Sequence, residues 1–380
     1  MNERIYDYWI ATLQDGYIGN LIRITQEAGG AKSLYNMSKN HMISELGLSQ
    51  KLSDHIAENR PGEDHLTVDY ERMLGKGISY VNYTDDDFPP KLRNIASPPY
   101  GIFVKGSLPD PNATSVAIVG ARDCSEYGRL MAEYFGNRLA REGVQVISGM
   151  AWGIDGIAQS AALAAGGRSF AVMGCGVDIT YPAKNAVLYR RLCSEGNGVI
   201  SEYAPQTPAI ARQFPPRNRI ISALSDVLIV VEARAKSGTL ITVDMAIDQG
   251  RTVMVVPGRL TDNLSVGCLK LLYQGALPAI GIDSVLEQLG LQKCVDISTH
   301  KKQRQKKEAN VAMPNGSAGL TPDLQTVADI LSLEPLSIDD IARRSGLDQS
   351  TAMIMLTKLE MTDQAKEIFP GFFVRQYSIT

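Results

Sequence analysis

The sequence predicts an α/β protein whose core is a Rossmann-like, doubly wound parallel sheet, with a small helical domain before it and a winged-helix domain after it. Two observations predict the core. Six short apolar runs, rich in β-branched residues and without polar alternation, recur between residues 115 and 256, as expected of strands buried on both faces. Helical stretches separate them, and repeated strand–helix units with right-handed crossovers build a parallel sheet. The expected strands are Ser115–Val119, Gln145–Ser148, Ser169–Met173, Gly198–Ser201, Val227–Val231 and Thr252–Val256, and the expected helices between them are Tyr127–Glu142, Ile157–Ala165, Ala186–Glu195 and Thr242–Asp248.

A chain of 380 residues is too long for one ordinary core, so several domains are expected. The predicted divisions are a helical domain of the SAM or helix-hairpin-helix type at 1–65, the Rossmann-like core at 66–292, a basic flexible linker at 293–319 and the winged-helix domain at 320–380.

The segments around the core have local signatures of their own. Leu46-Gly-Leu-Ser-Gln-Lys-Leu is typical of a helix, a tight turn and a second helix, which offers backbone N–H groups to a phosphate or serves only for packing. The prolines of Phe88-Pro-Pro-Lys-Leu are expected to pin the chain against the core, and the basic run that begins at His300 is typical of a disordered tether. In the tail, apolar residues at helical spacing, a third helix at Thr351–Met361 and two following strands predict a winged helix. That third helix carries few side-chain hydrogen-bond donors, so its sequence fits a contact with another protein at least as well as it fits the reading of DNA bases.

Composition narrows the function classes only slightly. The net charge of −3 means that any anion site must be a local patch on a near-neutral body. Five cysteines without metal-ligand spacing predict free thiols in a reducing cytoplasm. We find neither a signal-type apolar region at the start nor a run of 18 apolar residues, so we expect a soluble cytoplasmic protein with no membrane partner.

Nucleotide and hydrolase chemistry lack their usual residues. The turn after the first core strand, Gly120-Ala-Arg-Asp-Cys-Ser, does not match the dinucleotide-binding G-x-G-x-x-G, and no phosphate-loop motif is found. All four histidines lie outside the core, which disfavours a Ser–His or Cys–His pair and a zinc site. We therefore expect no catalytic residue, no metal and no cofactor.

The polar segments instead carry donors for phosphate. Loops after parallel strands meet at one edge of the sheet, so these segments are expected to converge. Arginine forks grip phosphate in a bidentate manner, backbone N–H groups of the Gly149–Gly153 turn add donors, and Phe214 offers a stacking face for an unpaired base. Each arginine alone is also consistent with a salt bridge that holds a loop. The predicted DNA-binding residues are Gly120, Ala121, Arg122, Arg212, Phe214, Arg217, Asn218, Arg219, Lys236 and Ser237, those from 212 to 219 lying in one loop.

The segments, taken in order, resemble the signature series of the DNA-processing protein A (DprA, or Smf) family. The resemblance covers residue 88 to about residue 289, and the helical head and the tail fit the longer members. The matching segments are A-I-V-G-A-R, S-G-x-A-x-G-I-D, the G-x-G before Y-P-x-x-N, S-E-Y, F-P-x-R-N-R-I-I, K-S-G-T-L-I-T, G-R-x-V and V-P-G, with F-P-P-K-L-R upstream.

The resemblance implies a non-enzymatic protein of natural transformation that binds and protects incoming single-stranded DNA and loads the RecA recombinase. The Gly-Ser-Arg motif through which the family binds DNA falls on Gly120, Ala121 and Arg122, and alanine in place of serine is expected to weaken binding at most. The family also forms homodimers, here expected through Leu269 and Leu272, which share one helical face at i and i+3. A core-facing role for these two leucines stays open.

Two other function classes remain as alternatives. One is a nucleotide or nucleoside hydrolase on a related sheet fold. Such enzymes have a segment that resembles P-G-G-x-G-T-x-x-E, whereas this chain has Lys236-Ser-Gly-Thr-Leu-Ile-Thr. Glu202 and Glu232 each follow a strand, where a general base can lie, or they pair with Arg217, Arg219 or Lys236 and orient those cations. The third class is an interaction scaffold for the tail domain.

Overall fold

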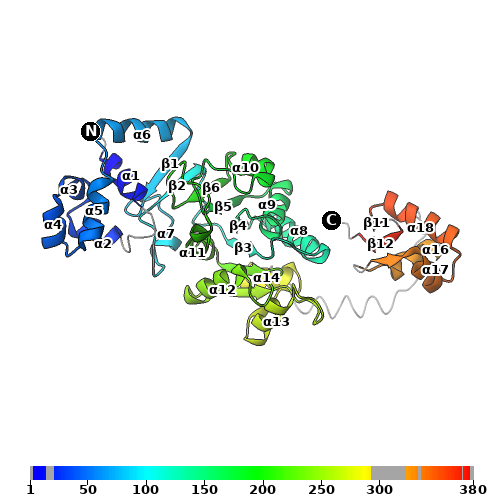
Figure 1. Ribbon diagram of the computed structural model, residues 1–380. Coiled ribbons are helices and arrows are strands. Elements are labelled where there is room, and N and C mark those ends of the chain that lie inside the picture. The colour runs from blue at the N-terminus through cyan, green and yellow to red at the C-terminus, as the bar shows by residue number, and fades with distance from the viewer. Residues whose placement is uncertain (1–2, 14–20, 292–321, 333–334, 370, 377–380) are drawn as a thin grey trace. The chain divides into compact units, whose positions relative to one another are not determined.

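The computed structural model describes residues 3–13, 21–291, 322–332, 335–369 and 371–376 (Figure 1). The chain divides into two compact units, 1–292 and 293–380. No helix in the described ranges is both long and apolar enough to cross a membrane. The predicted linker 293–319, with its basic run and Cys294, lies outside the described residues.

A nine-stranded sheet forms the centre of the first unit, in the order β1-β2-β6-β5-β4-β3-β7-β8-β9. In this order, β6, β5, β4, β3, β7, β8 and β9 each pair in parallel with their neighbour. β1 and β2 add an antiparallel edge beside β6. The predicted doubly wound core is confirmed, with β7 and β8 each ending one residue earlier than expected. The bounds are β1 (Ile78–Asn82), β2 (Gly101–Gly106), β3 (Ser115–Val119), β4 (Gln145–Ser148), β5 (Ser169–Met173), β6 (Gly198–Ser201), β7 (Val227–Val230), β8 (Thr252–Val255) and β9 (Leu277–Pro278).

Alternate residues of each central strand feed two separate hydrophobic clusters. In β3, Val116 and Ile118 pack with one group of helices, while Ala117 and Val119 pack with the other. This two-sided burial explains why the strands are apolar without alternation. The first group comprises α8 (Glu126–Arg141), α9 (Ile154–Ala164) and α14 (Ile282–Gln288), and the second comprises α7 (Pro90–Arg93), α11 (Phe214–Ala223), α12 (Gly238–Asp248) and α13 (Val266–Tyr273). The prolines of the 88–92 segment place Phe88 and Leu92 in the second cluster, as predicted.

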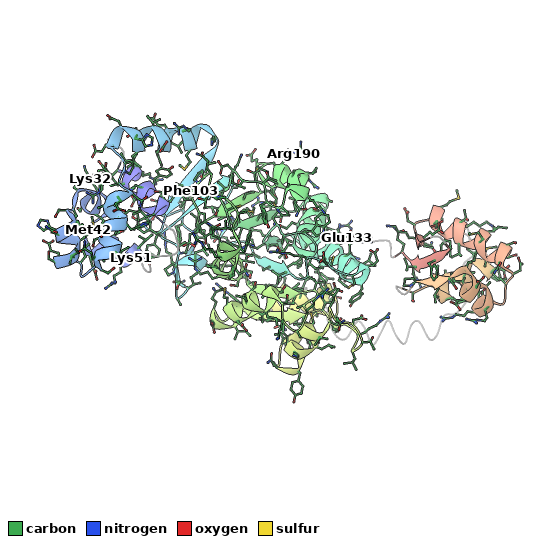
Figure 2. The ribbon with its side chains drawn as sticks, viewed as in Figure 1. Lys32, Met42, Lys51, Phe103, Glu133 and Arg190 are labelled. Carbon is green, nitrogen blue, oxygen red and sulfur yellow. The ribbon has the colours of Figure 1, made fainter. Side chains whose placement is uncertain are left out.

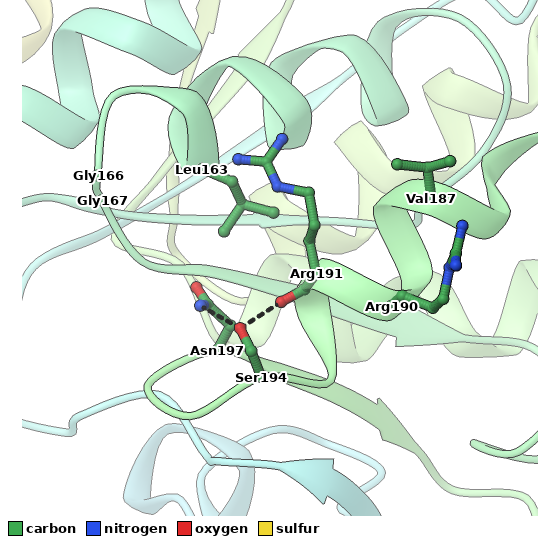
Figure 3. A pocket seen from close by; sticks show the side chains of 8 residues that line it. All are labelled: Leu163, Gly166, Gly167, Val187, Arg190, Arg191, Ser194 and Asn197. Atoms are coloured by element: carbon green, nitrogen blue, oxygen red, sulfur yellow. Dashed lines mark hydrogen bonds between the residues drawn. The ribbon is translucent and has the colours of Figure 1, made fainter.

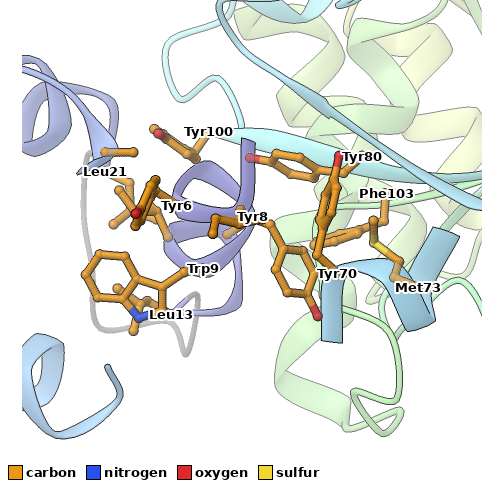
Figure 4. Packing of buried hydrophobic residues seen from close by; sticks show 14 of the residues in the cluster. Tyr6, Tyr8, Trp9, Leu13, Leu21, Tyr70, Met73, Tyr80, Tyr100 and Phe103 are labelled. Atoms are coloured by element: carbon orange, nitrogen blue, oxygen red, sulfur yellow. The ribbon is translucent and has the colours of Figure 1, made fainter. Parts of the chain in front are cut away.

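The helical head shares a hydrophobic cluster with the antiparallel edge of the sheet (Figures 2 and 4). The ring of Tyr8 contacts Phe103 of β2 with 6.1 Å between centroids, and Tyr100 donates a 2.5 Å hydrogen bond to Asp7. The predicted turn is present at Gly47, whose φ of +61° separates α4 from α5. The head contains α1 (Arg4–Thr12), α2 (Leu21–Glu27), α3 (Ala31–Asn36), α4 (Lys39–Ser44), α5 (Gln50–Glu58) and α6 (Glu63–Gly75).

The second unit is a winged helix, as the sequence predicts. Ser337 caps the second of its helices by accepting a hydrogen bond from the Asp340 amide. Its three strands pair in the order β10-β12-β11. The bounds are α16 (Pro322–Ile330), β10 (Leu336–Ser337), α17 (Ile338–Ser345), α18 (Gln349–Met361), β11 (Ala365–Phe369) and β12 (Phe372–Arg375).

Candidate nucleic-acid interface

The polar segments converge at the carboxyl edge of the parallel strands. β3 lies between β4 and β7, so the winding of the sheet reverses on either side of β3, and such a switch point opens a crevice between the loops that follow the two strands. The loop after β3 carries Arg122, and the loop after β7 carries Lys236. The Thr239 hydroxyl, at the start of the helix 238–248 that follows the β7 loop, donates a 3.2 Å hydrogen bond to the Gly120 carbonyl and so links that helix to the β3 loop.

The turn that presents Arg122 is held by the start of α9. The Ile154 amide donates to the Ala121 carbonyl at 3.2 Å. Gly153 lies against this turn with a φ of +83°, and a Cβ there would stand 2.2 Å from the Arg122 carbonyl oxygen. Only glycine therefore fits at this position. The Arg122 side chain itself is exposed, and among the described residues no carboxylate forms an ion pair with it.

A small pocket of about 50 Å³ lies beside Arg122 and is lined by aromatic rings. The Arg122 guanidinium carbon is 5.9 Å from the centroid of the Phe214 ring, and Tyr181 packs on Phe214 at 5.3 Å. Trp152 completes the lining and is 47% exposed, and Tyr181 is 38% exposed. Such rings offer apolar faces together with a nearby cation, which is the combination that unpaired bases and their phosphates require.

The segment that carries Phe214 is a helix, which corrects the prediction of a loop. Residues 214–223 form α11, whose first turn contains Pro215 and Pro216. Proline is favoured there because the first amides of a helix have no intrahelical partner. The helix directs its polar side chains to different sides, so they do not form one phosphate-binding cluster. Phe214 packs against Gly174, where a Cβ would lie 2.9 Å from the ring.

Arg217 points into the protein, contrary to the prediction that it offers its guanidinium to phosphate. Its residue is 6% exposed, and Nη1 donates to the carbonyl oxygens of Gly149 (3.1 Å) and Val172. Burial lowers the pKa of Arg217 to about 10, while the nearby carboxylate of Asp155 opposes that shift. Arg217 also lines the floor of the pocket and lies 5.6 Å from the Phe214 centroid. It therefore supports the pocket from below.

The two glutamates that follow strands, Glu202 and Glu232, both bind other side chains of the protein. Glu202 forms a 2.7 Å ion pair with Arg219, whose Nε also donates to the Ser97 carbonyl. This is the predicted pairing, and it leaves the Arg219 guanidinium engaged by a carboxylate, with its side chain 16% exposed. Glu232 is buried and accepts hydrogen bonds from the amide and the hydroxyl of Ser125, so its partner is a serine and not one of the expected cations.

The remaining predicted residues lie outside the pocket lining. Arg212 and Lys236 are exposed, and the Ser237 hydroxyl caps α12 at the Thr239 amide. Asn218 accepts from Arg217 Nε at 3.3 Å. Leu269 and Leu272 lie on α13 and are half-buried, with Leu272 packed against the core.

The Gly149–Gly153 turn offers fewer donors than predicted. The Gly149 amide donates to Asp155, and the Met150 amide donates to Gln159. Asn185 donates to the Met150 and Ala151 carbonyls, which explains the asparagine of Y-P-x-x-N. No group of three or more metal-ligating side chains occurs within the ranges that the structure describes.

Sequence reasoning missed three residues at this site, namely Trp152, Tyr181 and Lys184. The Lys184 ammonium lies 5.0 Å from the Trp152 ring centroid, and both side chains are exposed. A tryptophan in a glycine-rich turn was a signal that the sequence contained, because no apolar periodicity accounts for it there.

Comparison with known proteins identifies the family. The model of "DNA recombination-mediator protein A" matches residues 79–290, and that of the DprA winged helix domain matches 311–367. The chain belongs to the DNA recombination-mediator protein A family. Protein Smf of Escherichia coli is 35% identical over 76% of this chain and 75% of its own length.

Solved structures of DNA processing protein A agree with this assignment. That of Streptococcus pneumoniae superposes with a TM-score of 0.65 at 30% identity, covering 76% of this chain and 97% of the other. That of Helicobacter pylori, described for its single-stranded DNA binding mode, gives 0.50 at 28% identity, covering 56% and 95%. The family match spans both the β3 turn with Arg122 and the α11 segment with Phe214.

Proposed function

We propose that this family member binds single-stranded DNA at the Arg122 pocket. The observation that carries the proposal is an exposed arginine, without a carboxylate partner among the described residues, beside a pocket lined by Trp152, Tyr181 and Phe214. Arginine supplies a bidentate contact to a phosphate, and the rings supply stacking faces. The single-stranded DNA binding of the Helicobacter pylori relative supports the same ligand.

The pocket favours an unpaired strand over a duplex. Stacking on an aromatic ring requires a base whose face is free, and it contributes about 1–3 kcal/mol per base. The exposed parts of Trp152 and Tyr181 lie at the rim of a narrow pocket. A duplex presents its phosphates to Arg122 but keeps its base faces stacked. Phosphate contact is therefore common to both forms, and stacking is available only to the single strand.

The predicted contact residues take distinct parts in this proposal. Arg122 contacts phosphate and Phe214 faces the base, with Gly120 and Ala121 setting the turn. Arg217 positions the Gly149 turn through a hydrogen bond to the Gly149 carbonyl, and it supports Phe214 through the contact of its guanidinium with the ring. Arg212 and Lys236, which are exposed on neighbouring loops, add flanking phosphate contacts.

Binding of labelled oligothymidylate, measured by fluorescence anisotropy against salt, tests the proposal. We expect single strands to bind more tightly than a duplex of equal length. We expect Arg122→Ala to weaken single-strand binding and to reduce the salt slope by about 0.7, the value for one phosphate contact on a single strand. The exposed side chain makes unfolding an implausible cause, and a thermal melt checks this. Unchanged affinity in the variant, or equal affinity for duplex, would refute the assignment.

The family resemblance supports three finer roles, which we propose as part of the same function. The protein acts in natural transformation, protects incoming strands and loads RecA, and it does so as a homodimer through Leu269 and Leu272 of α13. The exposed apolar side chains of Tyr273 and Ile280 near that helix support an interface there. Strand exchange by RecA on DNA coated with single-strand-binding protein tests the loading role: no acceleration on adding this protein contradicts it.

A further inference from the structure

A shallow groove of about 550 Å³ lies at the far end of α9 and of α10 (Ala186–Leu192), as Figure 3 shows. Arg191 reaches toward Leu163 and the Gly166–Gly167 turn, whereas Arg190 leaves the helix beside Val187. Within the described part of the chain, no carboxylate forms an ion pair with either arginine. The groove is therefore a concentration of cations that the fold does not neutralise.

The groove and the Arg122 pocket lie at opposite ends of the same two helices. Helices between parallel strands run back from the carboxyl edge of the sheet to its amino edge. Trp152 precedes α9 and Tyr181 precedes α10, while the groove is lined by the end of α9 and by Arg190 and Arg191 at the end of α10, with Val187 from its first turn. The surface between the two sites is therefore continuous along α9 and α10.

One exposed face of this surface is lined with cations. Val187 and Arg191 are spaced i and i+4 in α10 and therefore share one face of that helix, and Lys184 lies in the 3-10 turn Ala183–Asn185 that leads into it. The sequence between residues 183 and 197 contains three cationic side chains and a single carboxylate, that of Glu195.

From this continuity we propose that the single strand, on leaving the Arg122 pocket, passes over Trp152 and follows α10, with its phosphates contacted by Lys184 and then held in the Arg190–Arg191 groove. This rests on the proposed function, because the pocket supplies the start of the path. A simple structural alternative is that the two arginines only compensate the negative end of the α10 dipole. Charge complementarity to a phosphate backbone and continuity with the pocket favour the strand.

The test compares the full-length protein with Arg190→Gln/Arg191→Gln, using oligothymidylates of about three nucleotides, which end before the groove, and of about twelve. Two lost phosphate contacts lower the salt slope for the longer strand by about 1.4, and if both proteins bind equally at 1 M salt, affinity at 0.1 M falls about 25-fold. The short strand, which the pocket accommodates alone, keeps its affinity. Equal affinity of the two proteins for the longer strand, or the same loss at both lengths, overturns the proposal.

A matched control removes the same charge elsewhere in the unit. Arg23→Gln/Lys32→Gln changes two exposed cations of the helical head, and Figure 2 shows that Lys32 lies far from Arg190. We expect this control to bind both lengths as the parent does; a loss equal to that of the groove variant means that only bulk charge matters, which overturns the path. Thermal melts identify a purely structural role, in which stability falls and the affinity for the longer strand does not.

Two further results distinguish this proposal from a failure of the proposed function and from binding of an acidic protein segment. If Arg122→Ala binds as tightly as the parent, the proposed function itself fails, whatever the groove variant does. If polyglutamate binds in a manner that requires Arg190 and Arg191 while DNA of both lengths is unaffected by their loss, the groove serves an acidic protein segment, and the strand path is wrong.

Discussion

Replacing Arg217 with methionine is expected to destabilise the first unit strongly, although the residue was first predicted from sequence as a DNA contact. The variant leaves the carbonyls of Gly149 and Val172 without this donor and removes the cation closest to the buried Asp155. Arg217 and Asp155 form no direct ion pair, but a buried acceptor left without its donor costs about 1–3 kcal/mol, and the buried Asp155 also loses its nearby cation. We therefore expect a total loss of about 3–5 kcal/mol. At about 2–4 °C per kcal/mol for a unit of this size, the melting temperature should fall by about 10 °C.

The pH dependence of this effect follows from Asp155. Burial raises the pKa of Asp155 in the folded state, and Arg217 opposes that rise, so the variant should raise the pKa further. A carboxyl whose folded pKa lies above its unfolded value of about 3.9 holds its proton more firmly when folded, so its stability cost grows as pH rises through that window. Urea denaturation should therefore show a smaller loss in the free energy of unfolding near pH 4 than near pH 8.

The double variant Asp155→Asn/Arg217→Met isolates the charge. Removing both buried charges costs less than leaving the Asp155 carboxylate buried without its nearby cation, and the asparagine oxygen can still accept the bond that Gly149 donates to Asp155 at 3.0 Å. We expect the double variant to be more stable than the single one at pH 8 and to lose the added pH dependence. If the two are equally unstable, or if Arg217→Met melts with the parent, the reasoning on this pair is refuted.

Four further outcomes are expected. Trp152 is 47% exposed and Trp9, the other tryptophan, is buried, so single-stranded DNA should quench fluorescence in the parent and not in Trp152→Phe; quenching that persists excludes stacking on Trp152. Gly153→Ala should lower both melting temperature and DNA affinity, because its Cβ would collide with the Arg122 carbonyl at a φ of +83°; a parent-like protein by both measures contradicts this. Leu269→Glu should sediment as a folded monomer, whereas an intact dimer or an unfolded chain rejects the α13 interface. Finally, nucleotides should not be turned over, and release of base that disappears in Glu232→Gln would establish a hydrolase instead.

Sequence alone determined the elements of the core and where its polar loops meet. Strands such as Ser115–Val119 were recognisable because burial on both faces demands an uninterrupted apolar run. Parallel pairing then places the loops after those strands at one edge, whatever the detailed packing. The Arg122 turn was therefore located correctly at that edge.

Only the tertiary structure decided which cations are available to a ligand. Arg217 and Arg219 are two residues apart, yet neither presents a free guanidinium, because α11 turns one toward Gly149 and the other toward Glu202. That outcome depends on carbonyls and a carboxylate supplied by other strands, which local spacing does not encode. Trp152, conversely, belongs to the pocket only because the segment before α10 brings Tyr181 and Lys184 beside it. Composition names the donors, but burial and long-range partners determine which of them remain exposed to bind DNA.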